Sequence, residues 1–338
     1  MTRKKRPQHR HAGIDVSAKE LHAAIEGTEE VLLFDNTPAG HKRLLKVLTK
    51  RGVAARVLVE ATGAYHLDVA LALARHKRCS VMVANPRMTK HFHQAQGIRA
   101  KTDKVDARSL LAFVQRMPFV PWEPPNDQLL ELRATTRYAA QLVKQQTRLK
   151  NQLTALGASE ISPSWVSTDI QESLTELAHR IERARQRARD IAHQDPKVQL
   201  QVEHLDAIPG IGPDTAVALV AEFSVLDREM SAKQIAAWAG LDPRPRESGT
   251  SVRGRRPISK RGNARVRAML YMPALSVSRD KGPLGDFYRR IETRSARKSV
   301  ALIAAMRKLL TVAWALHSTG SAWDENKVRP RHYIEEAA

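Results

Sequence analysis

Hydrophobic and polar positions in the first third of the chain alternate between two periods, and this alternation predicts an α/β domain. Short apolar runs indicate strands at 13–16, 21–25, 31–34, 56–60 and 80–83. Helical spacing indicates helices at 37–50, 65–76, from Asn85-Pro86 onward, and at 101–116. Three strands followed by alternating helices and strands predict a layered fold with a mixed sheet over residues 13–117.

The segments on either side of this domain have a different composition. Residues 1–12 hold five Lys or Arg and no acid, which predicts a disordered basic arm. The stretch from Pro118 to Pro125 has four prolines in eight residues. Proline donates no backbone hydrogen bond, so we interpret residues 118–126 as a linker.

Residues 127–198 have the pattern of a helical hairpin. Its second arm carries apolar residues at alternating spacings of four and three: Ile170, Leu174, Leu177, Ile181, Ala184, Ala188 and Ile191. That spacing is a heptad seam, which buries itself against another helix. The spacing alone leaves two alternatives open, a hairpin within one chain and a coiled coil that joins subunits.

Residues 199–322 predict a second, mainly α-helical domain, followed by a polar tail at 323–338. The stretch from Leu205 to Leu219 has the form of a helix-hairpin-helix, with Pro-Gly-Ile-Gly between its helices. The backbone amides of Gly210, Ile211 and Gly212 are therefore candidates for contact with a nucleic-acid phosphate.

Charge and composition narrow the class of protein. The 338 residues include 56 Lys or Arg and 35 Asp or Glu, a net charge of +21, which favours a nucleic-acid partner. The single cysteine, Cys79, excludes an intrachain disulfide framework and a cysteine-based zinc site. No uncharged apolar run reaches the ~18 residues of a membrane span, and no apolar core follows the basic N-terminus as in a signal peptide.

Four acids stand where packing explains them poorly. Asp15 lies on the first strand, Glu60 ends another, and Asp103 and Asp106 share one helix face. A buried carboxylate is costly unless it is paired or bound to metal, and hard oxygen ligands suit Mg²⁺ or Mn²⁺. Taken singly, Asp103 has the alternative role of a helix N-cap, and Asp106 that of a helix-dipole partner.

A basic segment runs from Arg244 to Gly262. Between 241 and 270 there are nine Lys or Arg against two acids, with Ser and Gly interleaved, a composition that fits phosphate contact. The candidate nucleic-acid contacts are Arg244, Arg246, Arg253, Arg255, Arg256, Lys260 and Arg261. Ser248 is a candidate nucleophile, although an isolated serine in a loop is ordinarily just a loop residue and no histidine lies nearby to activate it.

Together these residues resemble the Piv/MooV-type insertion-sequence transposases, which are bridge-RNA-guided recombinases. The resemblance rests on Gly13-Ile-Asp15, Val59–Tyr65 and Asn85-Pro86, on Lys101–Arg108 and Ile208–Gly212, and on Ala239–Arg244 and Glu247–Gly254. These stretches extend over nearly the whole chain.

The resemblance implies a RuvC/RNase H-like N-terminal domain in which Asp15, Glu60, Asp103 and Asp106 bind metal. It implies that Ser248 forms a covalent phosphoserine link to DNA. It also implies dimers or tetramers formed through the coiled coil, target and donor DNA paired by a noncoding guide RNA, and a cytoplasmic, nucleoid-associated protein. Two other hypotheses stay open: a RuvC-like Holliday-junction endonuclease that uses water, and a non-catalytic nucleic-acid-binding protein.

Overall fold

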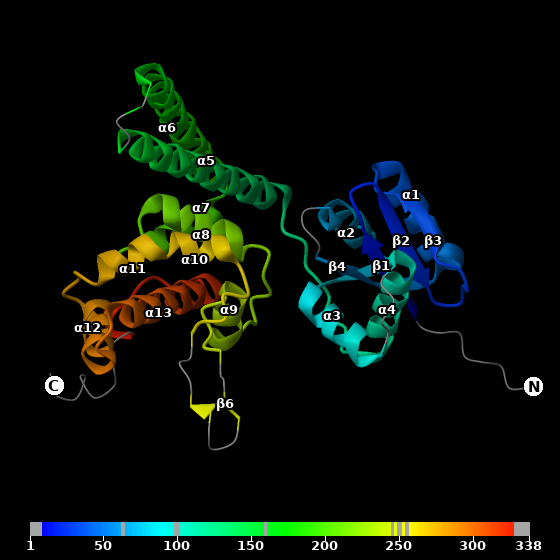
Figure 1. The fold of residues 1–338 in the computed structure, drawn as a ribbon. Coiled ribbons are helices and arrows are strands. Elements are labelled where there is room, and N and C mark those ends of the chain that lie inside the picture. The colour runs from blue at the N-terminus through cyan, green and yellow to red at the C-terminus, as the bar shows by residue number, and fades with distance from the viewer. Residues whose placement is uncertain are drawn as a thin grey trace, which may run out of the picture. The chain divides into compact units, whose positions relative to one another are not determined.

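The computed structural model describes residues 9–61, 65–97, 102–158, 161, 163–244 and 257–327, and the backbone alone at 247–248 and 252–253. The chain divides into two compact units, Met1–Pro124 and Pro125–Ala338 (Figure 1). The first unit is an α/β domain and the second is mostly helical.

The N-terminal unit is built on a five-stranded mixed sheet, as the sequence pattern predicts. Its strands are β1 (His9–Val16), β2 (Glu20–Ile25), β3 (Leu32–Asp35), β4 (Ala54–Glu60) and β5 (Cys79–Ala84). The strand order is β3-β2-β1-β4-β5, with β1–β2 and β2–β3 antiparallel and β1–β4 and β4–β5 parallel. A sheet of this kind is consistent with the RuvC-like fold.

The start of β1 corrects one prediction. His9 pairs with Ala54 of β4, so residues 9–12 belong to the sheet and not to a disordered arm. Arg10 also donates from Nη1 to the carbonyl of Val47, at 2.7 Å. Parallel pairing with a central strand holds this basic stretch, which has no periodic apolar pattern of its own. Residues 1–8 lie outside the described residues.

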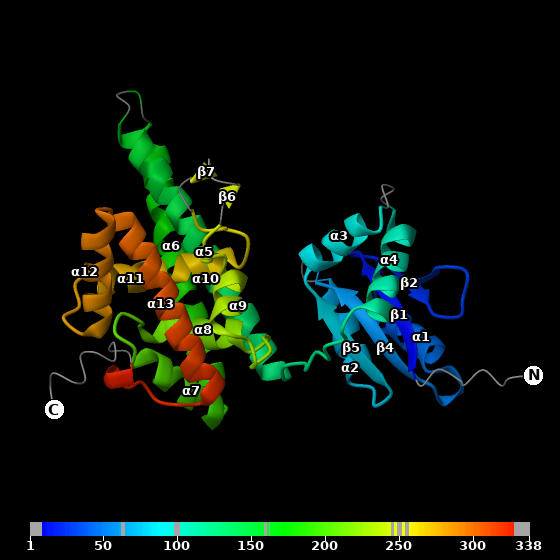
Figure 2. The same ribbon diagram turned by 90° about the horizontal axis from the view of Figure 1, so that it is seen from below.

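Helices cover both faces of the sheet (Figure 2). Helices α1 (Pro38–Leu48) and α2 (His66–Ala74) pack on the face that carries Val57 and Val59. Helices α3 (Pro86–Ala95) and α4 (Asp103–Arg116) cover the opposite face, where Leu58 packs with Phe113. The alternation of Val57, Leu58 and Val59 between faces follows from the two-residue period of a strand, and it explains why β4 reads as a continuous apolar run.

Part of the proline-rich segment belongs to the N-terminal unit. The Trp122 amide donates to the carbonyl of Val81 on edge strand β5, at 2.7 Å. The guanidinium of Arg56 lies 5.4 Å from the centre of the Phe119 ring. Residues 119–122 of the predicted linker 118–126 therefore pack against the N-terminal unit, because the segment has one amide placed to extend the sheet.

The C-terminal unit begins with an antiparallel helical hairpin, α5 (Asp127–Gly157) and α6 (Ser164–His193). The seam of α6 is buried in its own chain: Leu177, Ile181 and Ala184 form one cluster with Ala139 and Leu142 of α5. Of the two alternatives for this seam, the structure has the hairpin within one chain.

The remaining helices form one large core. They are α7 (Pro196–Asp206), α8 (Pro213–Phe223), α9 (Ala232–Ala239), α10 (Ala264–Met269), α11 (Tyr271–Val277), α12 (Pro283–Ser295) and α13 (Lys298–Thr319), followed by the short 3-10 helix η2 (Glu325–Lys327). A two-stranded ribbon, β6 (Glu247–Ser248) and β7 (Val252–Arg253), stands out from the helical body (Figure 1). The sequence pattern misses this ribbon because two-residue strands leave no periodicity.

Helix α13 is long and apolar enough to cross a membrane by length and composition alone. Arg307 and Lys308 interrupt it, and Ala305, Leu309 and Ala313 are buried in the core of the C-terminal unit. The helix is therefore accounted for as a core helix.

Candidate active site and nucleic-acid interface

Asp15 and Glu60 lie at the carboxyl ends of neighbouring parallel strands. The register of β1 and β4 pairs Ile14 with Val59, so Asp15 and Glu60 are each the next residue on adjacent strands. Because parallel strands end at the same edge of a sheet, the two carboxyl groups come from one edge. Asp15 is half-buried, and its Oδ1 accepts a hydrogen bond from the Val16 amide at 3.0 Å.

Gly13 brings helix α4 to the same edge. A Cβ at this position would lie 2.2 Å from the backbone nitrogen of Leu111 and 2.7 Å from the carbonyl oxygen of Ala107. Only glycine lets the helix backbone approach β1 this closely. Two residues before Asp15, Gly13 therefore sets the distance between the strand and the helix that carries the other two acids.

Asp103 and Asp106 occupy the first turn of α4. The N-cap is Thr102, whose hydroxyl oxygen accepts from the Val105 amide at 3.3 Å. The alternative in which Asp103 caps the helix is therefore wrong. The positive end of the helix dipole lies where both side chains stand.

The four acids form one electrostatic group. Burial, followed by the charges of Asp103, Asp106 and Glu60, raises the pKa of Asp15 to about 6, against the Val16 hydrogen bond that lowers it. Four carboxylates that repel one another at the end of a sheet form a site that favours a cation.

Several neighbours of this group were not predicted. Thr89 is buried on α3 and donates from Oγ1 to Oε2 of Glu60 at 2.5 Å. His93, one turn further along α3, has Nδ1 3.7 Å from Oδ1 of Asp106. Asn85 is the N-cap of α3, and Thr89 and His93 follow it at intervals of four. All three residues therefore lie on one face of the helix, and this spacing of polar residues is visible in the sequence.

His22, on β2, is a third neighbour. It is paired with Asp15 across β1 and β2, and its Nδ1 lies 4.0 Å from Oδ2 of Asp103.

The donor set fits a hard divalent cation in kind, since carboxylate oxygens are the ligands that Mg²⁺ prefers. Within the described residues, no three acid or histidine side chains already converge as a closed metal-ligand set. Residues 62–64 and 98–101, which follow Glu60 and precede Asp103, lie outside those residues.

The ribbon that carries Ser248 has a well-defined base. The Arg244 amide donates to the carbonyl of Pro257 at 2.8 Å, and the Ser259 amide to that of Asp242 at 2.8 Å. The hydroxyl of Ser259 also bonds to the carboxylate of Asp242. Ser248 stands on β6, with its backbone paired to Val252 of β7.

The structure describes some of the predicted basic contacts and not others. Arg244, Lys260 and Arg261 are exposed on the base of the ribbon. Arg253 is described only by its backbone, and the side chain of Ser248 likewise lies outside the described residues. Arg246, Arg255 and Arg256 lie wholly outside the described residues.

The helix-hairpin-helix prediction needs correction at Ile211. Its side chain is 4% exposed within the core, and its amide donates to the carbonyl of Ile208 at 3.0 Å. Gly210, with φ +89°, packs so closely that a Cβ would lie 2.7 Å from the carbonyl oxygen of Pro273. The turn therefore serves packing at Gly210 and Ile211, while Gly212 has open space around it.

The chain matches two transposase family models. Residues 12–156 match a transposase model of the DEDD type from the IS110 group, and residues 202–289 match the transposase model of the IS116/IS110/IS902 family. A DEDD domain suggests dependence on a divalent metal.

Two relatives agree with this assignment over 93% of the chain. The pilin gene-inverting protein of Moraxella lacunata is 31% identical over 93% of this chain and 98% of its own. The protein of the same name from Moraxella bovis is 28% identical over the same shares. A protein of insertion element IS116 from Streptomyces clavuligerus is 28% identical over 44% of this chain and 36% of its own. The chain belongs to the IS110/IS116 family of transposases, enzymes that cleave and rejoin DNA.

Proposed function

We propose that this transposase excises and inserts its own insertion element by strand exchange, guided by a noncoding bridge RNA. Ser248 is the proposed nucleophile, and Asp15, Glu60, Asp103 and Asp106 are the proposed metal ligands. The observation that carries the proposal is electrostatic: burial, together with the charges of Asp103, Asp106 and Glu60, raises the pKa of Asp15 to about 6. The enzyme would act in the bacterial cytoplasm, on nucleoid DNA, as a dimer or tetramer.

In the proposed reaction the hydroxyl oxygen of Ser248 forms a bond to a DNA phosphorus and displaces a deoxyribose oxygen. The phosphoserine link then keeps the energy of the phosphodiester bond, so a second strand can be joined without net hydrolysis. A bound Mg²⁺ or Mn²⁺ would supply charge stabilisation and activation of the attacking oxygen. The group of Asp15, Glu60, Asp103 and Asp106 would activate the serine hydroxyl, either as ligands of that ion or as the acceptor of the serine proton.

The ribbon supports this assignment of the nucleophile by its charge. Arg244, Lys260 and Arg261 lie exposed at its base, and cations around a reacting phosphate stabilise the charge that develops there. The net charge of +21 supports contact with both RNA and DNA backbones, since such contacts carry little sequence information.

The decisive experiment is to trap and map the covalent adduct. Ser248→Ala should abolish recombination and the protein–DNA adduct while leaving nucleic-acid binding intact. Thr250→Ala and Ser251→Ala are the matched controls, because they remove the neighbouring hydroxyls. Peptide mapping that finds DNA on any residue other than Ser248 would refute the assignment.

The guide RNA has its own test. RNA that copurifies with the full chain should be dominated by one noncoding transcript of the element, as read by sequencing. Recovery of bulk cellular RNA alone would remove the guided part of the proposal.

The second candidate function is a RuvC-like endonuclease that uses water. The acid group favours it as much as the first, because four carboxylates suffice for metal-dependent hydrolysis. Intact cleavage in Ser248→Ala, with no adduct in the wild type, would favour this candidate.

A further inference from the structure

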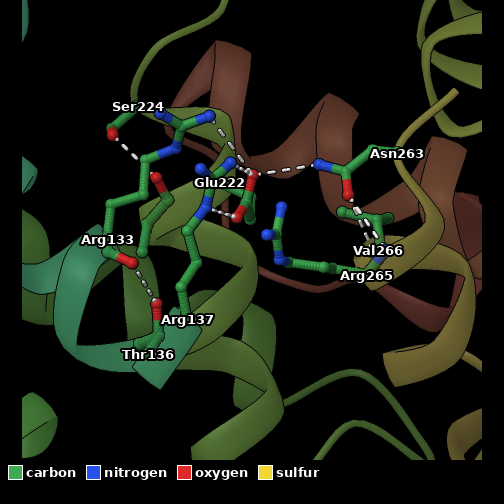
Figure 3. Close-up of polar contacts among 9 residues, drawn as sticks. Arg133, Thr136, Arg137, Glu222, Ser224, Asn263, Arg265 and Val266 are labelled. Atoms are coloured by element: carbon green, nitrogen blue, oxygen red, sulfur yellow. Dashed lines mark hydrogen bonds and ion pairs between the residues drawn. The ribbon is translucent and has the colours of Figure 1, made fainter. Parts of the chain in front are cut away.

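Glu222 is a buried carboxylate that ties together three parts of the C-terminal unit. It lies in the last turn of α8 and is 1% exposed. It accepts from Nε and Nη2 of Arg137 on α5, at 2.6 and 3.0 Å, and from Nδ2 of Asn263 at 3.0 Å (Figure 3). Arg133, one turn before Arg137, has Nη2 at 3.6 Å from the same carboxylate.

Asn263 connects this carboxylate to the ribbon that carries Ser248. It directly follows Gly262, which packs so tightly that a Cβ would lie 2.2 Å from the carbonyl oxygen of Trp238. The backbone amide of Asn263 donates to that same carbonyl at 2.7 Å, and the side-chain Oδ1 of Asn263 accepts from the backbone amide of Arg265 at 3.1 Å. The returning end of the ribbon is therefore fixed at Glu222.

Positive charge exceeds negative charge in this group. The guanidinium groups of Arg133, Arg137 and Arg265 gather near the single carboxylate of Glu222 (Figure 3). Burial lowers the pKa of Arg133, against the attraction of Glu222, and the charges of Arg137 and Arg265 lower it further. The buried Nε of Arg133 has no hydrogen-bond partner among the residues that the structure describes.

The three arginines remain accessible. The side chains of Arg133 and Arg137 are 21% and 29% exposed, and Arg265 is exposed on α10. Nε and Nη2 of Arg137 donate to Glu222, so these two bonds leave Nη1 of Arg137 able to donate to a ligand. Guanidinium groups bind phosphate through paired donors, and an anion would balance the excess charge.

We propose that Arg133, Arg137 and Arg265 bind a phosphate of the DNA backbone beside the base of the Ser248 ribbon, with Glu222 holding Arg137 in position. The inference deepens the proposed function of the ribbon. Its test is a binding equilibrium, so it stands or falls independently of the serine adduct.

The test measures binding of the full chain to labelled duplex DNA by fluorescence anisotropy between 50 and 200 mM salt. Arg265→Gln should make the slope of log affinity against log salt less steep by up to about one, because it removes one of the three guanidinium charges that face the proposed phosphate. Arg265→Lys, which keeps the charge, should restore most of the slope. Arg294→Gln on α12 is the matched control, since it removes the same charge from an exposed position on another helix, and its slope should equal that of the wild type.

Two outcomes overturn the proposal. One is an unchanged slope in a folded Arg265→Gln protein, which would leave the group a purely structural one. The other is a changed slope with an RNA duplex of the same sequence but not with DNA, which would assign the site to RNA. A measurement on the wild type avoids any loss of folding: DNA should protect Arg265 from phenylglyoxal, as read by peptide mass spectrometry, and absence of protection refutes the site.

Discussion

At the residue scale, the pKa of Asp15 shows how its neighbours prepare the site. The pKa stands at about 6, where an ordinary aspartate has 3.8, first because of burial and then because of three nearby carboxylates. The folded protein thus binds this proton more tightly than the unfolded chain does. The stabilising contribution of the protonated carboxyl is fully present below pH 3.8 and is lost as the pH rises through about 6.

Asp15→Asn should therefore stabilise the metal-free protein at high pH. In EDTA, the Tm of the variant should exceed that of the wild type at pH 8, and the difference should shrink as the pH falls to 4, as measured by thermal denaturation. Glu20→Gln removes an exposed carboxylate from the next strand and should show no such dependence. Equal pH profiles for Asp15→Asn and the wild type would contradict the raised pKa.

Thr89 is the residue-scale contact that the sequence did not reveal. Its hydroxyl donates to Glu60 at 2.5 Å, and residues that orient a metal ligand typically change activity about 10–100-fold when replaced. Thr89→Val should lower DNA cleavage within that range without unfolding the protein, and Thr89→Ser, which keeps the hydroxyl, should restore it. Full cleavage by the valine variant would show that Thr89 does not orient Glu60.

The acids and Thr89 also show what sequence reasoning reaches at this scale. Asp15 and Glu60 are conspicuous because a carboxylate next to an apolar strand run is poorly explained by packing. The spacing of α3 places Thr89 on one helix face with Asn85 and His93, but the contact with Glu60 joins residues 29 apart in sequence. Such a pairing follows from the tertiary fold, which local patterns do not contain.

At the scale of elements, the distance between β1 and α4 decides where Asp103 and Asp106 lie. Gly13 lies under the backbone of Ala107, Leu110 and Leu111 and permits the close approach. The pattern of apolar residues predicted both elements, but it contained nothing about how near they pack.

Gly13→Ala should force α4 away from β1. Overpacking of this kind costs on the order of 1–3 kcal/mol in the free energy of unfolding, and cleavage should fall with it. Denaturant unfolding and a cleavage assay measure the two effects. Gly157→Ala, where a Cβ meets nothing within 4 Å, should lower neither stability nor cleavage. A Gly13→Ala protein as stable and active as the wild type would refute the close packing.

The hairpin of α5 and α6 shows that the apolar pattern has the same limit in predicting how helices pack. The heptad spacing of α6 predicted a buried seam, and the seam is buried. A partner helix from the same chain and one from another subunit fit that spacing equally well, so the spacing alone does not distinguish them.

Leu177→Asp with Ile181→Asp should therefore destabilise the hairpin within each chain. Unpaired charges in an apolar seam are costly, so circular dichroism should show partial loss of helix at a lower temperature, independent of protein concentration. Glu172→Asp with Glu176→Asp, on exposed positions of the same helix, is the control. A concentration-dependent loss would instead point to a seam shared between subunits.

At the scale of the whole molecule, the positive charge is spread over both units. Residues 1–124 contain 22 Lys or Arg and 11 Asp or Glu, and residues 125–338 contain 34 and 24, so the units carry +11 and +10. The net charge predicted a nucleic-acid partner correctly in kind, since the family acts on DNA. Where on each unit the nucleic acid binds depends on which cations the fold gathers on one surface, as at the base of the ribbon.

The ribbon should carry a localised share of that binding. Replacing Arg253, Arg255, Arg256, Lys260 and Arg261 with Ala should weaken affinity for all nucleic-acid sequences. It should also flatten the salt slope by about 0.9 for each phosphate that the variant no longer neutralises, so by between about one and five overall. The control removes five exposed cations from the region around α12: Arg279, Lys281, Arg294, Arg297 and Lys298. Both variants lose the same charge, so a general electrostatic attraction would flatten both slopes equally. A flatter slope in the ribbon variant alone would show that its cations contact phosphates directly, and equal slopes in the two variants would refute a localised interface.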